Sequence, residues 1–122
     1  MPTGACDCHA HVFTQASKLV ANRVYTPPAA SMEQYLTVLD TLRIDRAVIV
    51  QPSVYGGDNR ATLQAVAEGG DRFRAVVVLD DKITPRHLQQ MHDQGARGAR
   101  INALFSGAYR REYLIRLGHF LA

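Results

Sequence analysis

The sequence predicts an α/β fold in which about four strand–helix units with parallel strands form part of a (β/α)8 barrel (a partial TIM barrel). Two short apolar runs, Arg46–Val50 and 73–79, are rich in β-branched residues, as expected for strands covered on both faces. A helical pattern follows each predicted strand, which indicates parallel strands joined by right-handed crossovers. A complete barrel takes about 250 residues. The 122 residues therefore predict a single domain, residues 1–122, equivalent to the amino-terminal half of a barrel.

The first and fourth strands are predicted over residues 4–12 and 98–102. The first strand contains the motif Asp-Cys-His-Ala-His at residues 7–11. A doubly wound sheet that binds nucleotides has a glycine-rich phosphate loop after its first strand, and this motif is not such a loop. The difference favours the barrel over the open sheet.

Start and stop signals delimit the predicted helices. Ser31 can accept a hydrogen bond from the amide of Gln34, whose side chain can reach back, and this capping box predicts a helix start. Thr84 followed by Pro85 predicts another start, because a hydroxyl caps the helix and proline suits its first position. The other predicted elements are a helix ended by Gly69 and Gly70, a fourth helix over 110–117, and a long loop over 13–30.

The first predicted strand carries a ladder of polar side chains. Because side chains alternate between the two faces of a strand, Asp7, His9 and His11 are predicted to share one face. Cys6 and Cys8 then point to the helices as buried small apolar groups. Polar side chains inside a fold must be hydrogen-bonded, ligated or hydrated, so the ladder marks a candidate site. For the histidines, metal ligation or carbonyl polarisation competes with a purely structural hydrogen-bonded pair.

The fourth predicted strand brings further polar groups to the same interior. Arg100 and Asn102 alternate along it with Ala99 and Ile101. If the two apolar residues pack under helices, the two polar ones face the barrel interior near the carboxyl end of the strand, where catalytic residues lie. A buried guanidinium needs a partner. The candidates are a substrate carboxylate, held through two parallel hydrogen bonds, and the carboxylate of Asp7.

Composition and charge exclude several classes of function. The formal net charge is +3, and Lys and Arg are scattered with no run longer than Arg110-Arg111, so nucleic-acid binding is not supported. The positive bias can favour an anionic small substrate. No stretch approaches the ~18 apolar residues of a membrane helix, and no secretory signal pattern is visible. Two cysteines separated by one residue make a poor disulfide framework. These features predict a cytoplasmic protein that binds neither nucleic acid nor membrane.

Four stretches, in order, resemble the amidohydrolase-related metal-dependent hydrolases of the amidohydrolase superfamily. They are Asp7-x-His9-x-His11, Tyr25-Thr26-Pro27 with the capped helix after it, the segment RAVIVQPSVYG at 46–56, and Gly95-x-Arg97-Gly98-x-Arg100-Ile101-Asn102. The branch that the chain most resembles comprises lactonases that act on pyrone dicarboxylates and sugar-acid lactones. The resemblance covers essentially all 122 residues.

The resemblance implies a hydrolase that cleaves the C–O bond of a small, anionic, carboxylated lactone or ester by attack of water. His9 and His11 are the implied catalytic residues, which stabilise the oxyanion or bind a divalent metal, with zinc as the expected ion and a metal-free site as the alternative. Asp7 is expected to orient a histidine. The implied substrate-binding residues are Tyr25, Ser53, Arg100 and Asn102.

Two of the implied substrate-binding residues, Ser53 and Tyr25, also have possible structural roles. Ser53 and Tyr55 are predicted to lie on the face that carries the histidines. If Ser53 does not bind substrate, its hydroxyl is a turn or helix-cap group, and Tyr25 is then a loop anchor.

A full member of the family carries a further histidine and an aspartate base that lie beyond the length of this chain. The sequence therefore predicts a truncated hydrolase with little activity of its own. One alternative is a non-catalytic half barrel that self-associates through exposed strand edges, as a homo-oligomer, or complements another chain. Others are a product without an independent role and, within the enzyme class, a superfamily decarboxylase.

Overall fold

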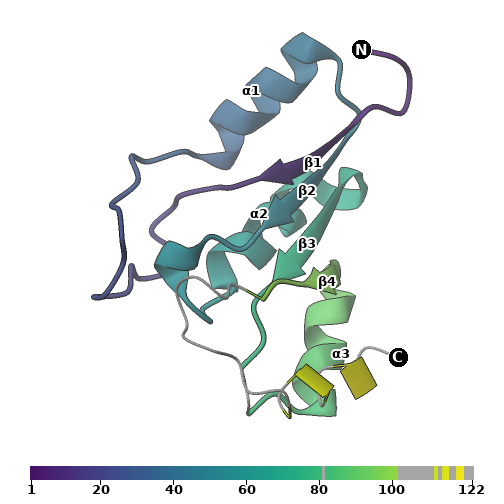
Figure 1. Cartoon of the computed structure of the whole chain (residues 1–122). Helices are drawn as coiled ribbons and strands as arrows, with labels where there is room; N and C mark the ends of the chain where they lie inside the picture. The colour runs from purple at the N-terminus through teal and green to yellow at the C-terminus, as the bar shows by residue number, and fades with distance from the viewer. Residues whose placement is uncertain (81, 102–111, 113, 116–117, 120–122) are drawn as a thin grey trace.

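Four parallel strands form one sheet in the computed structural model, which describes residues 1–80, 82–101, 112, 114–115 and 118–119 (Figure 1). The strands are β1 (Cys6–Ala10), β2 (Arg46–Val50), β3 (Phe73–Val77) and β4 (Ala96–Ala99). Their order is β1-β2-β3-β4, and each strand pairs in parallel with the next one along the chain. A doubly wound sheet reverses its strand order, whereas a barrel wall does not. The observed order is the one predicted for part of a barrel.

Helices lie between the strands, and the two whose starts the sequence predicts begin at those positions. The helices are α1 (Met32–Leu42), α2 (Arg60–Gly69) and α3 (Pro85–Asp93), with 3-10 turns η1 (Ser53–Tyr55) and η2 (Gly70–Arg72). Ser31 and Gln34 form the capping box at the start of α1. The Thr84 hydroxyl accepts the amide of His87 at the start of α3. Gly70 follows α2 with a φ of 61°, which a glycine adopts without strain.

The hydrophobic core lies between the sheet and the helices. Ile49 of β2, Leu39 of α1 and Phe73 and Ala75 of β3 are fully buried there, together with Val66 of α2. Side chains alternate along a strand, so the opposite face of the sheet carries the residues between them. That face, called the inner face below, includes Arg46 and Val48 of β2 and Arg74 and Val76 of β3. The hydrophobic core therefore lies on the helix side of the sheet, and the inner face is the side opposite to it.

Some predicted boundaries are wrong. The first strand is shorter than residues 4–12, and the third ends at Val77 rather than at 79. The fourth begins at Ala96, two residues before the predicted start, and ends at Ala99. Asn102 and most of the predicted helix over 110–117 lie outside the described residues. Within the part of the chain that is described, no helix has the length and apolar character needed to cross a membrane.

The long loop over 13–30 is fastened to the body of the protein. Phe13 and Ala30 close it as an isolated antiparallel bridge. The Tyr55 hydroxyl donates to the carbonyl of Thr14 at 2.7 Å and accepts the amide of Thr14 at 2.9 Å. Tyr55 is only 2% exposed. It is therefore a loop anchor, and its predicted place on the face with the histidines stays a prediction.

Candidate functional site

A bulge in β1 changes which side chains face the interior. Asp7 pairs with Ala47 of β2, and Ala10 pairs with Ile49, so three residue steps of β1 match two of β2. Paired residues of neighbouring parallel strands point to the same face. Asp7 and Ala10 therefore both point to the helix side, with the buried Ala47 and Ile49. One extra residue between them is the mark of a β-bulge.

The bulge places the two histidines on the inner face. His9 and His11 flank Ala10, which packs against the core, so both rings point away from the helices. Their ring centroids are 5.0 Å apart, in an edge-to-face arrangement. The prediction that Asp7 shares their face is wrong, because a strict alternation of faces does not continue through a bulge.

Asp7 has partners other than the predicted ones. The Tyr35 hydroxyl of α1 donates to Asp7 Oδ2 at 2.7 Å, and the backbone amide of His9 donates to Asp7 Oδ1 at 3.1 Å. Burial, and next the hydrogen bond to Asp7, raise the pKa of Tyr35 above its ordinary value, so the phenol stays a proton donor. The carboxylate thus contacts helix α1 and the strand backbone rather than Arg100.

The prediction of buried cysteines is also wrong. Cys6 and Cys8 are both exposed. Cys6 pairs with Arg46, which lies on the inner face, and Cys8 sits within the bulge. The thiols therefore lie away from the helix layer.

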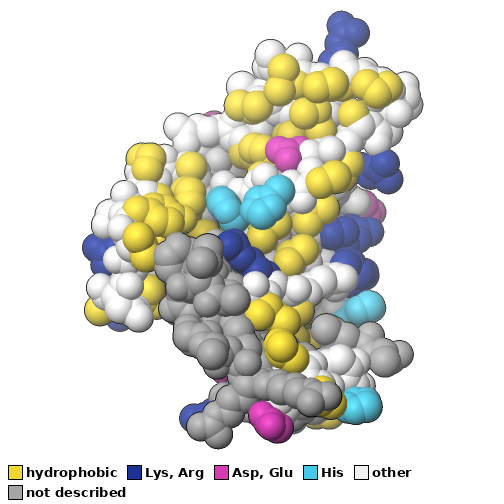
Figure 2. All heavy atoms as spheres, in the orientation of Figure 1, with side chains coloured by type: hydrophobic (Ala, Val, Ile, Leu, Met, Phe, Trp, Pro, Cys, Tyr) yellow, Lys and Arg dark blue, Asp and Glu magenta, His cyan; other side chains and the backbone are white. Residues whose placement is uncertain are grey.

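Two consecutive carbonyls at the end of β2 hold the candidate functional groups. His11 Nδ1 lies 2.7 Å from the carbonyl of Val50, and Arg100 Nη1 donates to the carbonyl of Gln51 at 3.0 Å. A carbonyl can only accept, so Nδ1 of His11 carries the proton and Nε2 is free to accept or to bind a ligand. In Figure 2, histidine atoms adjoin Lys or Arg atoms near the middle of this face. The carboxyl ends of β1, β2 and β4 thus meet at one site.

We expect His11 to titrate below its ordinary value of 6.5. Burial lowers the pKa of His11, the charges of His9 and Arg100 act in the same direction, and the bond to Val50 opposes them. The unfolded chain then binds the proton more tightly, so this group's contribution to stability is present above pH 6.5 and is lost as the pH falls through the folded pKa. An NMR titration of the imidazole measures it. Arg100→Gln should raise the His11 pKa, and Arg97→Gln should leave it unchanged; a His11 pKa at or above 6.5 contradicts the expectation.

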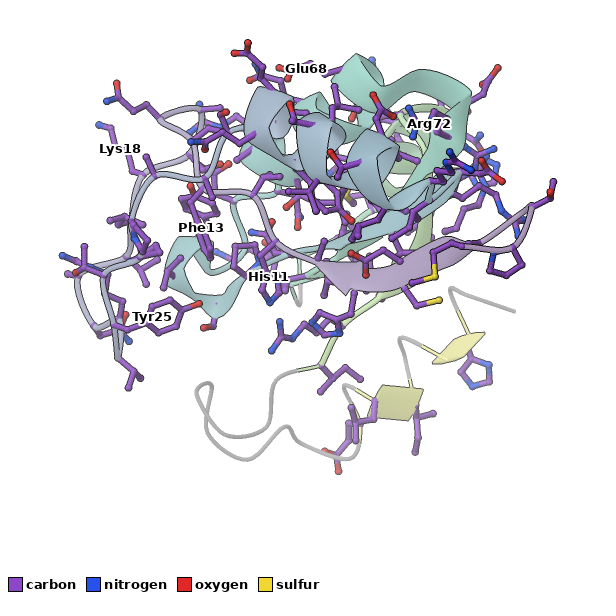
Figure 3. The ribbon with its side chains drawn as sticks, turned by 90° about the horizontal axis from the view of Figure 1, so that it is seen from above. His11, Phe13, Lys18, Tyr25, Glu68 and Arg72 are labelled. Carbon is purple, nitrogen blue, oxygen red and sulfur yellow. The ribbon has the colours of Figure 1, made fainter. Side chains whose placement is uncertain are left out.

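The other predicted site residues lie at different distances from this centre. Ser53 is half-buried and begins η1, two residues after β2. The η1 turn has no side-chain cap, so its start is not explained by the Ser53 hydroxyl. Tyr25 is 43% exposed, on the long loop, and lies farther from the sheet than His11 (Figure 3). Asn102 is outside the described residues, so its predicted role stays a prediction.

The described residues offer part of a metal site. Zinc in proteins usually takes about four ligands. His9 and His11 can supply two imidazole nitrogens, and the bond of His11 to Val50 is the kind of contact that orients a ligating histidine. No group of three or more His, Cys, Asp or Glu side chains that could hold a metal occurs in the described residues. These residues alone do not complete a zinc site.

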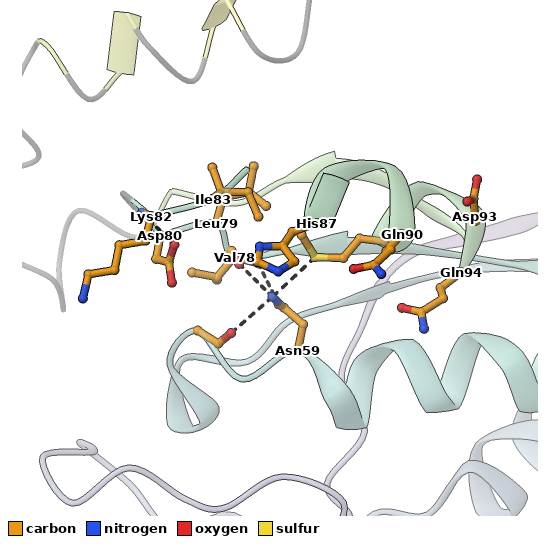
Figure 4. Close-up of a pocket in the computed structure, with 12 residues that line it drawn as sticks. Asn59, Val78, Leu79, Asp80, Lys82, Ile83, His87, Gln90, Asp93 and Gln94 are labelled. Atoms are coloured by element: carbon orange, nitrogen blue, oxygen red, sulfur yellow. Dashed lines mark hydrogen bonds between the residues drawn. The ribbon is translucent and has the colours of Figure 1, made fainter. Parts of the chain in front are cut away.

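A separate groove of about 700 Å³ lies between the start of α2 and helix α3 (Figure 4). Asn59 closes one side, where its amide nitrogen donates to the carbonyl of Val78 at 2.8 Å and its oxygen accepts the Val78 amide at 2.9 Å. None of the predicted site residues lines this groove. Its position therefore sets it apart from the histidine pair.

Sequence reasoning did not identify two residues that shape the site. Tyr35 fits the apolar stripe of α1, so its hydroxyl gives no signal of a contact with Asp7. Gln51 follows an apolar strand and is fully buried. A polar residue at the end of a buried strand was the available signal for Gln51, because a buried amide requires hydrogen-bond partners.

Two curated proteins similar to this chain are named as hydrolases. The chain is 39% identical over 104 residues to a 2-pyrone-4,6-dicarboxylate hydrolase from Comamonas testosteroni, across 84% of this chain and 34% of that relative. It is 39% identical over 102 residues to a 4-sulfomuconolactone hydrolase from Hydrogenophaga intermedia, across 82% and 34%. The chain thus spans about a third of the length of these relatives.

A solved structure confirms the fold class. The chain superimposes with a TM-score of 0.85 on a probable 2-pyrone-4,6-dicarboxylic acid hydrolase from Acinetobacter baumannii, crystallised with citric acid bound. The sequence identity is 26%, and the match covers 96% of this chain and 46% of that one. The four strands and the helices between them therefore form part of a (β/α)8 barrel. The amidohydrolase family model matches residues 6–116, and the chain belongs to the amidohydrolase family.

Proposed function

We propose that the chain contributes part of a site that hydrolyses a small carboxylated lactone. The observation that supports this most is the convergence of His9, His11 and Arg100 at the carboxyl ends of the strands, with two of them bound to consecutive carbonyls at the end of β2. The names of the relatives describe hydrolases of anionic lactones. The citric acid bound in the solved relative is a tricarboxylic acid, which supports a carboxylated ligand.

Each group has a separate task in this proposal. Arg100 uses one donor on Gln51, and its remaining donors can hold a substrate carboxylate. Water attacks the lactone carbonyl carbon, charge develops on the carbonyl oxygen, and the C–O bond of the ring breaks to give a hydroxy acid. A ring N–H of His9 can stabilise the developing charge, whereas Nε2 of His11, which carries no proton while Nδ1 donates to Val50, can accept a hydrogen bond from the substrate or bind a metal. If zinc binds, His9 and His11 would hold it, and it would supply Lewis-acid chemistry. Ser53, Tyr25 and Asn102 are proposed substrate contacts.

The described residues place no carboxylate base in hydrogen-bond contact with the histidine rings. In the part of the chain that the structure describes, no carboxylate hydrogen-bonds to the imidazole rings or to the Arg100 guanidinium, because Asp7 points to Tyr35. A general base is needed to activate water. We therefore expect slow lactone turnover from this chain alone, and ligand binding is the sharper test.

Citrate binding tests the proposal. We expect citrate to bind the chain and Arg100→Gln to weaken binding at least about tenfold, because hydrogen bonds to a charged group contribute roughly 1.5–3 kcal/mol. Calorimetric titration at low ionic strength measures it. Arg97→Gln is the matched control, because it removes an equal positive charge from a nearby position on the chain. The Arg97 guanidinium donates to the carbonyls of His92 and Ala96 and not to that of Gln51. Equal affinities for the two variants would mean unspecific attraction and would contradict the proposal.

Self-association is the second candidate. β1 and β4 are the edges of the described sheet, and edge strands can pair with another chain. Light scattering across a range of concentrations separates the two cases. A stable dimer that does not bind citrate favours a non-catalytic half barrel, whereas citrate binding that depends on Arg100 favours the hydrolase site. We also propose that the protein is located in the cytoplasm.

A further inference from the structure

The contact between α1 and β1 lies directly beside the bulge. Tyr35 packs its ring near Phe73, with centroids 6.1 Å apart, so the phenol is held against the core. Its hydroxyl reaches Asp7 Oδ2 at 2.7 Å. The carboxylate of Asp7 is thereby fixed on the helix side of the sheet, level with Ala47.

The second oxygen of that carboxylate serves the bulge itself. A bulge leaves an extra residue out of the strand ladder, and a backbone amide without a ladder partner needs another acceptor. Asp7 Oδ1 accepts the amide of His9 at 3.1 Å, two residues along. One carboxylate therefore connects the helix hydroxyl to the bulged backbone.

The bulge decides the direction of the histidines. With uninterrupted alternation, residues 7, 9 and 11 would all point to the side of Asp7, which is the helix side. The extra residue reverses the phase after Asp7, so Ala10 takes the helix side and the rings of His9 and His11 take the inner face.

We propose that Tyr35 and Asp7 are positioning residues, which hold the β1 bulge through a hydroxyl–carboxylate–amide chain and so direct His9 and His11 into the site. The inference concerns the same histidines as the proposed function, but it rests on their geometry and needs no turnover. It assigns to Tyr35, a residue of the helix layer, control over the chemistry of the opposite face.

Tyr35→Phe tests the inference, because it removes the hydroxyl and keeps the ring against Phe73. We expect the His9 amide to exchange with solvent about tenfold faster or more, as a hydrogen bond to a charged group is weakened. We also expect loss of the NMR contact between the His9 and His11 rings. Thr37→Val is the matched control: its hydroxyl lies on the exposed side of α1 and bonds to the Glu33 carbonyl.

A double-mutant cycle makes the result decisive. Tyr35→Phe should add almost nothing to the His9 exchange rate in an Asp7→Ala background, because both changes break the same chain of contacts. If Asp7→Ala does not fold, Tyr35→Phe alone decides. An unchanged His9 exchange rate with an intact ring contact overturns the inference, as does an equal change in Thr37→Val. Citrate binding is measured separately, so failure of the proposed function and failure of this inference give different results.

Discussion

Replacing Gly69 with alanine is expected to destabilise the chain by about 3 kcal/mol, in the upper part of the range for overpacked cores. Gly69 is the last residue of α2, and a Cβ there would lie 2.5 Å from Cγ of Phe73 and closer still to Cδ2 and Cε2. Phe73 is fully buried, so its ring is enclosed by other atoms and cannot swing out into solvent. Urea unfolding measures the loss as a lower midpoint with an unchanged slope.

Gly57→Ala is the control for this prediction. Apart from the residue itself and its two chain neighbours, no atom lies within 4 Å of the Cβ that it would add, so we expect a change within about 0.5 kcal/mol. Phe73→Leu in the Gly69→Ala background should recover part of the loss, because it removes the ring edge that the new methyl group meets. A Gly69→Ala chain as stable as the original would show that α2 and β3 can separate at this point.

The expected loss of stability is opposite to the change that helix propensity alone predicts. Helix propensity alone favours alanine over glycine in a helix by about 1 kcal/mol. The sequence marks Gly69 only as a helix stop, and the contact with Phe73 becomes visible when the chain folds back through η2. A stop signal and a close approach between elements look the same in one sequence.

The elements that the sequence predicts well are those set by near neighbours. The capping box of Ser31 and Gln34 acts over three residues, and the hydroxyl of Thr84 acts over the same span. Strand order also follows, because consecutive strand–helix units leave few parallel topologies. The fold class could therefore be derived without coordinates.

The face of the sheet to which each side chain of β1 points could not be derived in the same way. The bulge in β1 depends on its register with β2 and on a hydroxyl 28 residues away, at Tyr35. The anchor of Arg100 is a carbonyl 49 residues away, at Gln51. Alternation correctly separates the histidines from Ala10, but it fails for Asp7 and the cysteines, since a single extra residue inverts every assignment before it.

Replacing Gln51 with methionine should also cost about 3 kcal/mol. The Gln51 side chain is fully buried, and its amide nitrogen donates to the carbonyls of Gly56 and Asp58 at 3.1 and 3.0 Å. Its oxygen accepts the hydroxyl of Thr62, which is also fully buried. Methionine has nearly the same shape, so the loss comes from the partners, and each buried polar group left unpaired costs about 1–3 kcal/mol. Gln64→Met, on the exposed side of α2, should change stability by less than about 0.5 kcal/mol.

The same change connects stability to the site. The backbone carbonyl of Gln51 holds Arg100, and its side chain holds the turn that begins with Ser53. Gln51→Met removes only the second contact, so citrate affinity that depends on Arg100 should survive in conditions where the chain stays folded, while hydrogen exchange in residues 53–58 speeds up. Thr62→Val should produce a smaller loss, because it removes one of the three hydrogen bonds. A cost below about 1 kcal/mol for Gln51→Met would mean that water replaces the amide beneath this turn, and that the turn is held in place by Tyr55 and the long loop instead.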